Sequence, residues 1–98
     1  MNISTIAASE LDRYVGRKDV IIVDVREVQA FNYKHFKGAI NIPVREMEKV
    51  ALDSSKEIIL YCERGAASLK AAAFLAKRGY KVKSVVGGIN AYKGSFLS

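Results

Sequence analysis

The sequence has very few of the residues that usually build disulfides and metal sites. Its 98 residues include one cysteine and one histidine. A single cysteine cannot form an internal disulfide, so nothing here requires an oxidising compartment. Because Cys62 and His35 lie far apart in the sequence, carboxylates would have to complete any metal site, and no ligand spacing suggests one. We therefore expect neither a metal nor another cofactor.

Long apolar segments are also missing. No stretch reaches the length of a membrane-spanning helix, and the charged residues Glu10, Asp12 and Arg13 precede any long apolar run. This pattern excludes an ordinary secretory signal peptide. We expect a cytoplasmic protein with no membrane partner.

The chain does have enough apolar residues for one core, and it has an excess of basic ones. Hydrophobic residues make up 50% of the sequence, which suits one small domain over residues 1–98. Sixteen Lys and Arg against ten Asp and Glu give a net charge of +6, which favours anionic partners. The basic residues are scattered along the chain, which argues against nucleic acid as the partner.

Apolar strand-like runs alternate with segments of helical pattern. Residues 20–25 form a continuous, mostly β-branched run, typical of a strand buried on both faces of a parallel sheet, and we expect it at the centre of the sheet. The expected strands are 3–6, 20–25, 39–42, 58–61 and 81–86, and the expected helical segments are 9–16 with Ser9 as N-cap, 27–33, 45–52, 66–78 and 89–93, before a frayed tail. This order predicts an α/β fold with an open, mainly parallel sheet and helices on both faces.

The sole cysteine lies where an expected strand opens into a loop and then a helix. Ligands of open parallel sheets bind outside the carboxyl ends of the strands, which is where Cys62 stands. Backbone N–H groups and a helix N-terminus around the sulfur would lower its pKa and make it a nucleophile. The alternative is a buried core cysteine, since free cysteines are commonly buried.

Three separated motifs resemble the rhodanese family of sulfurtransferases. They are residues 22–27 (IVDVRE), 35–43 (HFKGAINIP) and 61–68 (YCERGAAS), followed by 86–92 (VGGINAY) near the end of the chain. Their order and spacing cover nearly the whole sequence. The resemblance implies a five-stranded, mainly parallel sheet. It also implies that Cys62 takes a sulfane sulfur from a donor, carries it as a persulfide and passes it to a nucleophilic acceptor.

The resemblance places the site in the loop that begins at Cys62. We expect Cys62 to be the catalytic residue and its neighbours to bind the substrate, namely Glu63, Arg64, Gly65, Ala66, Ala67 and Ser68. Backbone N–H groups of residues 63–68 can converge on the sulfur and stabilise first the thiolate and then the charged terminal sulfur. Gly65 lets the chain turn without a Cβ penalty. Ser68 either donates its hydroxyl to the anion or caps the helix.

One position departs from the family loop, which commonly reads C-x-x-G-x-R-S. Ala67 stands where an arginine usually helps to hold an anionic donor such as thiosulfate. Arg64 is a candidate to supply part of that charge, whereas Glu63 would oppose the thiolate. We therefore expect weak use of thiosulfate, with less effect on transfer from polysulfides and persulfides.

Other polar residues of the motifs have structural interpretations. We expect Asp24 and Arg26, at the end of a strand, to fix a neighbouring loop, and His35 to make a structural hydrogen bond rather than shuttle protons. A phosphatase of the related fold would need an arginine at the position of Ser68, so we exclude it. The competing hypothesis is a binding or regulatory module that has lost efficient catalysis and contacts an acidic or persulfidated protein.

Overall fold

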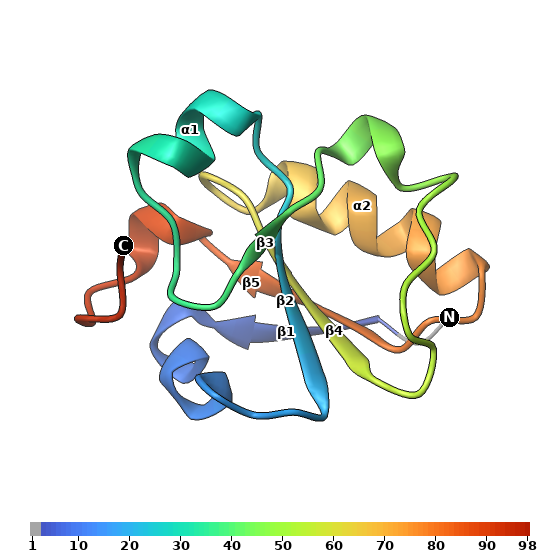
Figure 1. The fold of residues 1–98 in the computed structure, drawn as a ribbon, viewed down its shortest axis with the longest axis horizontal. Helices are drawn as coiled ribbons and strands as arrows, with labels where there is room; N and C mark the ends of the chain where they lie inside the picture. Colours follow the sequence, from blue (N-terminus) through green and yellow to red (C-terminus); the bar gives the residue numbers. More distant parts are fainter. Residues whose placement is uncertain (1–2) are drawn as a thin grey trace.

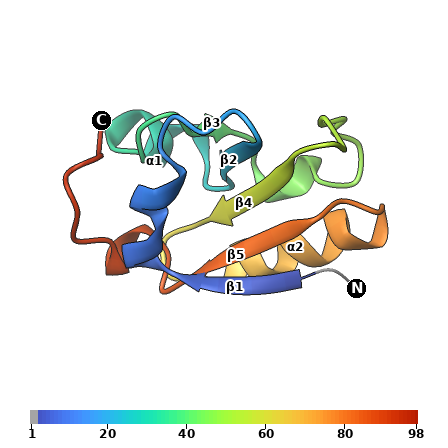
Figure 2. The ribbon, with the colours of Figure 1, turned by 90° about the horizontal axis from the view of Figure 1, so that it is seen from below.

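The computed structural model describes residues 3–98, which contain a five-stranded sheet whose neighbouring strands are all parallel. The strands are β1 (Ile3–Ala7), β2 (Val20–Asp24), β3 (Ile40–Asn41), β4 (Glu57–Tyr61) and β5 (Val82–Val86). Figures 1 and 2 show them in the spatial order β1-β5-β4-β2-β3. The predicted α/β fold is confirmed. The central strand is β4, however, so the prediction that residues 20–25 lie at the centre is wrong by one strand.

The sheet is covered on both faces, which explains why its inner strands β2, β4 and β5 are mostly apolar. Side chains alternate along β4, so Ile58 and Leu60 join one core cluster while Ile59 and Tyr61 join the other. The first cluster packs under α2 (Ala66–Lys77). The second packs under the 3₁₀ helices η1 (Ala8–Tyr14) and η3 (Ile89–Ala91). The remaining helical segments are α1 (Val28–Tyr33) and η2 (Val44–Glu46).

Two of the expected helical segments differ from the structure. The predicted N-cap at Ser9 is wrong, because η1 begins at Ala8 and has no side-chain cap. The helix predicted over 45–52 is only the single turn η2. Two backbone groups of this segment bond to other parts of the fold: Arg78 Nη1 donates to the Met47 carbonyl at 2.8 Å, and the Leu52 amide donates to the Tyr80 hydroxyl at 3.0 Å.

The C-terminal residues are held against the loop before β3, so the predicted frayed tail is wrong. Ser98 and His35 exchange two backbone hydrogen bonds at 2.8 and 3.0 Å, and the Lys37 amide donates to the Phe96 carbonyl at 2.7 Å. Phe96 and Leu97 pack against the core cluster beneath η1 and η3. Within residues 3–98, no helix has both the length and the apolar character needed to cross a membrane.

Candidate active site

Cys62 follows β4 directly, at the carboxyl edge of the sheet, and starts the loop that leads into α2. The loop ends at Gly65, whose φ of 111° is in the left-handed region that glycine adopts readily. A Cβ at this position would lie 3.2 Å from the Gly87 nitrogen. Gly65 is therefore required both by its backbone conformation and by the close approach of the turn after β5.

The sulfur of Cys62 lies in a cradle of hydrogen-bond donors at the N-terminus of α2. The Gly65 amide donates to Sγ at 3.0 Å and the Ser68 amide at 3.3 Å, while Ser68 Oγ lies 3.6 Å from Sγ. Cys62 is only 4% exposed, and this burial disfavours the charged sulfur. Hydrogen bonds from the Ser68 hydroxyl and from the loop amides outweigh the burial and lower the pKa of the Cys62 thiol below its ordinary value.

A second hydroxyl lies behind Ser68. Ser84, on β5, places its Oγ 2.9 Å from Ser68 Oγ, and both residues are buried. Ser68 has one hydroxyl proton, for which Sγ, Ser84 Oγ and the Gly65 carbonyl at 3.1 Å compete. If Ser84 donates to Ser68, the Ser68 proton is free to point at a Cys62 thiolate. Sequence reasoning missed Ser84; its only signal is a serine within a strand that is otherwise mostly valine.

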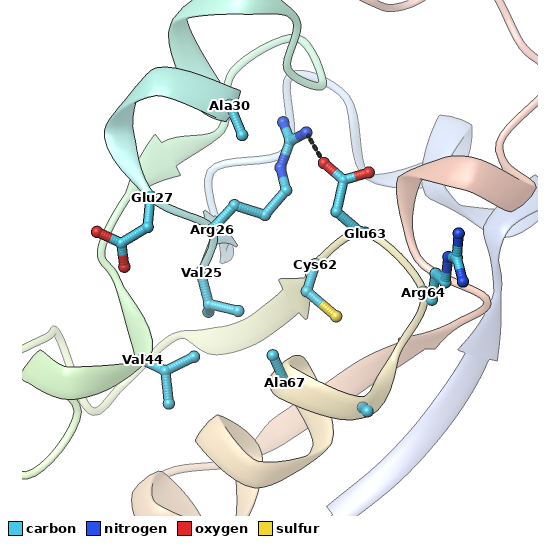
Figure 3. Close-up of a pocket in the computed structure, with 10 residues that line it drawn as sticks. Val25, Arg26, Glu27, Ala30, Val44, Cys62, Glu63, Arg64 and Ala67 are labelled. Carbon is cyan, nitrogen blue, oxygen red and sulfur yellow. Dashed lines mark hydrogen bonds and ion pairs between the residues drawn. The ribbon is translucent and has the colours of Figure 1, made fainter.

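A buried ion pair and a half-exposed one support the other side of the loop. The Arg26 guanidinium contacts the Asp24 carboxylate at 2.7 to 3.0 Å through Nε and Nη2, and donates through Nη1 to Glu63 at 2.7 Å (Figure 3). Burial opposes the charge of Arg26, but the bonds to Asp24 and Glu63 raise its pKa. Asp24 and Arg26 thus fix the cysteine loop, as expected. The Glu63 carboxylate, expected to oppose the thiolate, pairs with Arg26, but Arg26 also pairs with Asp24, so the three groups together keep one net negative charge.

A pocket of about 540 Å³ opens beside Cys62. Its lining comes from the end of β2, from α1, from the start of η2 and from the cysteine loop, and comprises Val25, Arg26, Glu27, Ala30, Val44, Cys62, Glu63, Arg64, Ala66 and Ala67. In Figure 3 the Arg64 side chain is directed away from the Cys62 sulfur, whereas Ala67 lies beside it. The structure therefore does not place the Arg64 guanidinium where the missing arginine would lie.

The comparison with known families agrees with this geometry. The family described as "Rhodanese-like domain" matches residues 7–95. The chain belongs to the rhodanese family. It is 30% identical over 94 residues to the thiosulfate sulfurtransferase GlpE of Coxiella burnetii, covering 93% of this chain and 85% of the relative.

Two further comparisons extend this result. The rhodanese chain is 32% identical over 104 residues to the thiosulfate:glutathione sulfurtransferase of Saccharomyces cerevisiae, covering 89% of this chain and 75% of the relative. A rhodanese-like domain protein from Staphylococcus aureus superposes with a TM-score of 0.84, covering 97% of this chain and 96% of the other. At 24% identity, that superposition supports the fold alone.

The only histidine of this rhodanese chain is not part of the pocket lining. His35 Nδ1 lies 2.9 Å from the Phe31 carbonyl oxygen, and its ring stacks on the Phe31 ring with centroids 3.9 Å apart. This is the structural hydrogen bond expected from the sequence. Across residues 3–98, no cluster of three or more His, Cys, Asp or Glu residues is arranged to hold a metal.

The structure thus brings the predicted site residues together in two ways. Gly65 and Ser68 contact the Cys62 sulfur directly, and Glu63, Ala66 and Ala67 line the adjoining pocket. The arrangement can hold a thiolate and can admit a donor from the pocket side. The catalytic role of Cys62 and the substrate-binding roles of its neighbours stay predictions.

Proposed function

We propose that the protein is a sulfurtransferase that carries a sulfane sulfur as a persulfide on Cys62. The observation that carries the proposal is the sulfur cradle: a thiol of lowered pKa receives hydrogen bonds from the Gly65 and Ser68 amides at the start of α2. A thiolate prepared in this way is already the reactive nucleophile, so the transfer needs no separate general base. The relatives named as sulfurtransferases support the same activity.

The reaction has two sulfur-transfer steps. With thiosulfate, the Cys62 thiolate attacks the outer sulfur, the Sγ–S bond forms, and the donor's S–S bond breaks as sulfite leaves with its electron pair. An acceptor nucleophile then attacks the terminal sulfur of the persulfide and restores the Cys62 thiolate. The amide donors around Cys62 stabilise negative charge on sulfur in both the free and the persulfide state.

The donors that fit best are polysulfides and persulfides. Ala67 offers no cation for the sulfonate oxygens of thiosulfate, and Arg64 is directed elsewhere. A polysulfide or persulfide presents its outer sulfur without such a group, so the missing guanidinium affects it less.

Intact-mass spectrometry tests the proposal. Reduced protein incubated with inorganic polysulfide, glutathione persulfide or thiosulfate should gain one sulfur atom, which cyanide then removes as thiocyanate. Cys62→Ser should gain none while keeping its circular dichroism spectrum. The proposal is overturned if no donor adds sulfur to protein whose Cys62 still reacts with an alkylating agent.

The absence of an arginine at position 67 gives a second prediction. Ala67→Arg should raise kcat/KM for thiosulfate about tenfold or more, the worth of one charge-assisted contact, and change transfer from glutathione persulfide little. Ala67→Gln is the control, since it adds a polar side chain that can hydrogen-bond but carries no charge. Equal thiosulfate rates in wild type and Ala67→Arg would contradict this account of donor choice.

A binding or regulatory module is the second candidate function, because Ala67 removes the usual oxyanion contact and the net charge of +6 favours an acidic partner. In that case retention of an acidic partner protein would be indifferent to Cys62→Ser. Retention that requires Cys62 favours a persulfidated partner and the sulfurtransferase.

A further inference from the structure

The pocket beside Cys62 is much larger than an inorganic sulfur donor needs. Its volume of about 540 Å³ falls among the sites that hold organic ligands, which span roughly 300 to 1,000 Å³. Cys62 stands on its wall, so a donor whose reactive sulfur reaches Sγ must place the rest of its body in this space.

Much of the wall is apolar. Val25, Ala30 and Val44 come from three different segments on the side facing the loop (Figure 3). Ala66 and Ala67 contribute from the start of α2. None of these five side chains can hydrogen-bond or carry charge. They form a surface that favours a hydrocarbon or aromatic group through the loss of water from both surfaces.

Three of the four charged side chains of the wall are paired. Arg26 is bound by Asp24 and Glu63, and Glu27 pairs with Arg45 at 2.6 Å. Arg64 is directed away from the sulfur in Figure 3. A doubly charged oxyanion would therefore meet a wall with little surplus positive charge.

We propose that this pocket binds the apolar organic body of a low-molecular-weight sulfur donor while the donor's outer sulfur reaches Cys62. The inference rests on the proposed sulfurtransferase function and deepens it, because it names the donor class: a persulfide or thiosulfonate with a hydrocarbon or aromatic body.

The transfer step balances for either donor. With a thiosulfonate R–SO₂–S⁻, the Cys62 thiolate attacks the terminal sulfur, the Sγ–S bond forms, and the donor's S–S bond breaks as R–SO₂⁻ leaves with the electron pair. With a persulfide R–S–S–H, the leaving group is R–S⁻, which takes the proton released by the Cys62 persulfide. The negative charge that remains on the terminal sulfur is held by the Gly65 and Ser68 amides.

Two thiosulfonates provide a matched test. Benzenethiosulfonate and methanethiosulfonate both carry one negative charge and the same reacting group, and they differ in the apolar body. The kcat/KM of sulfur loading on Cys62 is measured for each donor, and the value for benzenethiosulfonate is divided by that for methanethiosulfonate. Dividing this ratio by the same ratio of rates with free cysteine corrects it for the difference in intrinsic reactivity of the two donors. We expect the corrected benzene to methane ratio of kcat/KM to be about tenfold or more.

Filling the pocket should abolish the preference. Ala30→Leu adds bulk to the wall, so the benzene body loses its space and the corrected ratio should fall towards one. Ala51→Leu makes the same change at an exposed residue outside the pocket and should keep the wild-type ratio. Circular dichroism checks that both variants fold.

The outcomes separate the two proposals. Failure of every donor, inorganic polysulfide included, overturns the sulfurtransferase function and this inference with it. Loading by polysulfide together with a corrected wild-type ratio near one overturns this inference alone. So does a high ratio that Ala30→Leu leaves unchanged in folded protein.

Discussion

The reactivity of Cys62 depends on how many donors reach a sulfur that is almost removed from water. Burial alone would keep the thiol neutral, and the Ser68 hydroxyl and loop amides reverse that preference and lower the pKa of Cys62. Because folding lowers the pKa of Cys62, ionisation of the thiol also adds to the stability of the folded state. This contribution is fully present above the pKa of the unfolded thiol. That contribution is lost as the pH falls through the lower pKa of the folded thiol.

Ser84 should influence this titration although it does not touch the sulfur. If Ser84 donates to Ser68 across their 2.9 Å contact, Ser84→Ala removes that donor, so the Ser68 hydroxyl becomes a poorer donor to Cys62 and the thiol pKa rises. Near neutral pH, alkylation of Cys62 by iodoacetamide should slow about two- to fivefold, the effect of roughly one neutral hydrogen bond.

The control for this prediction is Ser84→Thr, which keeps the hydroxyl; the adjoining space of about 240 Å³ beside Ser84 offers room for the added methyl group. Its alkylation profile against pH should follow that of the wild type. A purely structural role of Ser84 would change the unfolding free energy without moving this profile, so identical profiles in wild type and Ser84→Ala would refute the coupling.

At the scale of elements, the first residues of η3 and the turn before them hold the backbone of the cysteine loop. The Ile89 amide donates to the Cys62 carbonyl at 2.8 Å, and the Asn90 amide donates to the Glu63 carbonyl at 3.1 Å. Gly88 allows this approach, with φ of 61° and ψ of −159°. A Cβ on Gly88 would overlap the Cys62 and Glu63 carbonyl groups. The turn therefore sets the backbone position from which Cys62 presents its sulfur.

Gly88→Ala should disturb both the fold and the site. The backbone strain costs about 1–3 kcal/mol, and displacement of the loop carbonyls should slow alkylation of Cys62 as well. Gly38→Ala is the control, because Gly38 also has a positive φ, 84°, but an added Cβ there would meet nothing within 4 Å. Urea unfolding should show a cost in both variants, and alkylation should slow only in Gly88→Ala. Normal Cys62 reactivity in folded Gly88→Ala would show that the turn does not position the loop.

The same elements show what the sequence could and could not predict. The inner strands were predictable because burial on both faces leaves a continuous apolar run, as in residues 20–25. The segment 45–52 has a helical pattern, but its backbone makes hydrogen bonds with Arg78 and Tyr80, and these partners lie outside any local pattern. Short helices depend on such tertiary contacts more than on their own propensity.

The contacts of the candidate site were also only partly predictable from the sequence. Gly65 and Ser68 are within six residues of Cys62, so a loop motif was enough to place them around the sulfur. Glu63 and Arg26 are 37 residues apart, and Ser68 and Ser84 are 16 apart. Those two contacts depend on how β2, β4 and β5 are aligned in the sheet, which the sequence pattern does not specify.

For the molecule as a whole, charge acts differently at long and short range. The chain carries a net charge of +6, which raises the concentration of anions near its surface. At the pocket itself, Arg26 and Glu27 are paired with neighbouring charges, so little local attraction is left for a bound oxyanion. Electrostatics should therefore contribute to the encounter with a donor more than to its retention.

The salt dependence of kcat/KM should test whether charge acts mainly on the encounter with the donor. As ionic strength rises and the screening length shrinks to about 10 Å at 0.1 M, kcat/KM should fall for every anionic donor. On a logarithmic scale the fall should be about twice as steep for doubly charged thiosulfate as for singly charged methanethiosulfonate, because the long-range attraction scales with donor charge. The double variant Lys81→Gln/Lys93→Gln lowers the net charge from +6 to +4 at two positions outside the pocket. It should make the salt dependence of kcat/KM less steep for both donors. At high salt its rates should equal those of the wild type. Equal slopes for the two donors, or slopes that the charge removal does not change, would mean that the overall field of the protein has no part in donor capture.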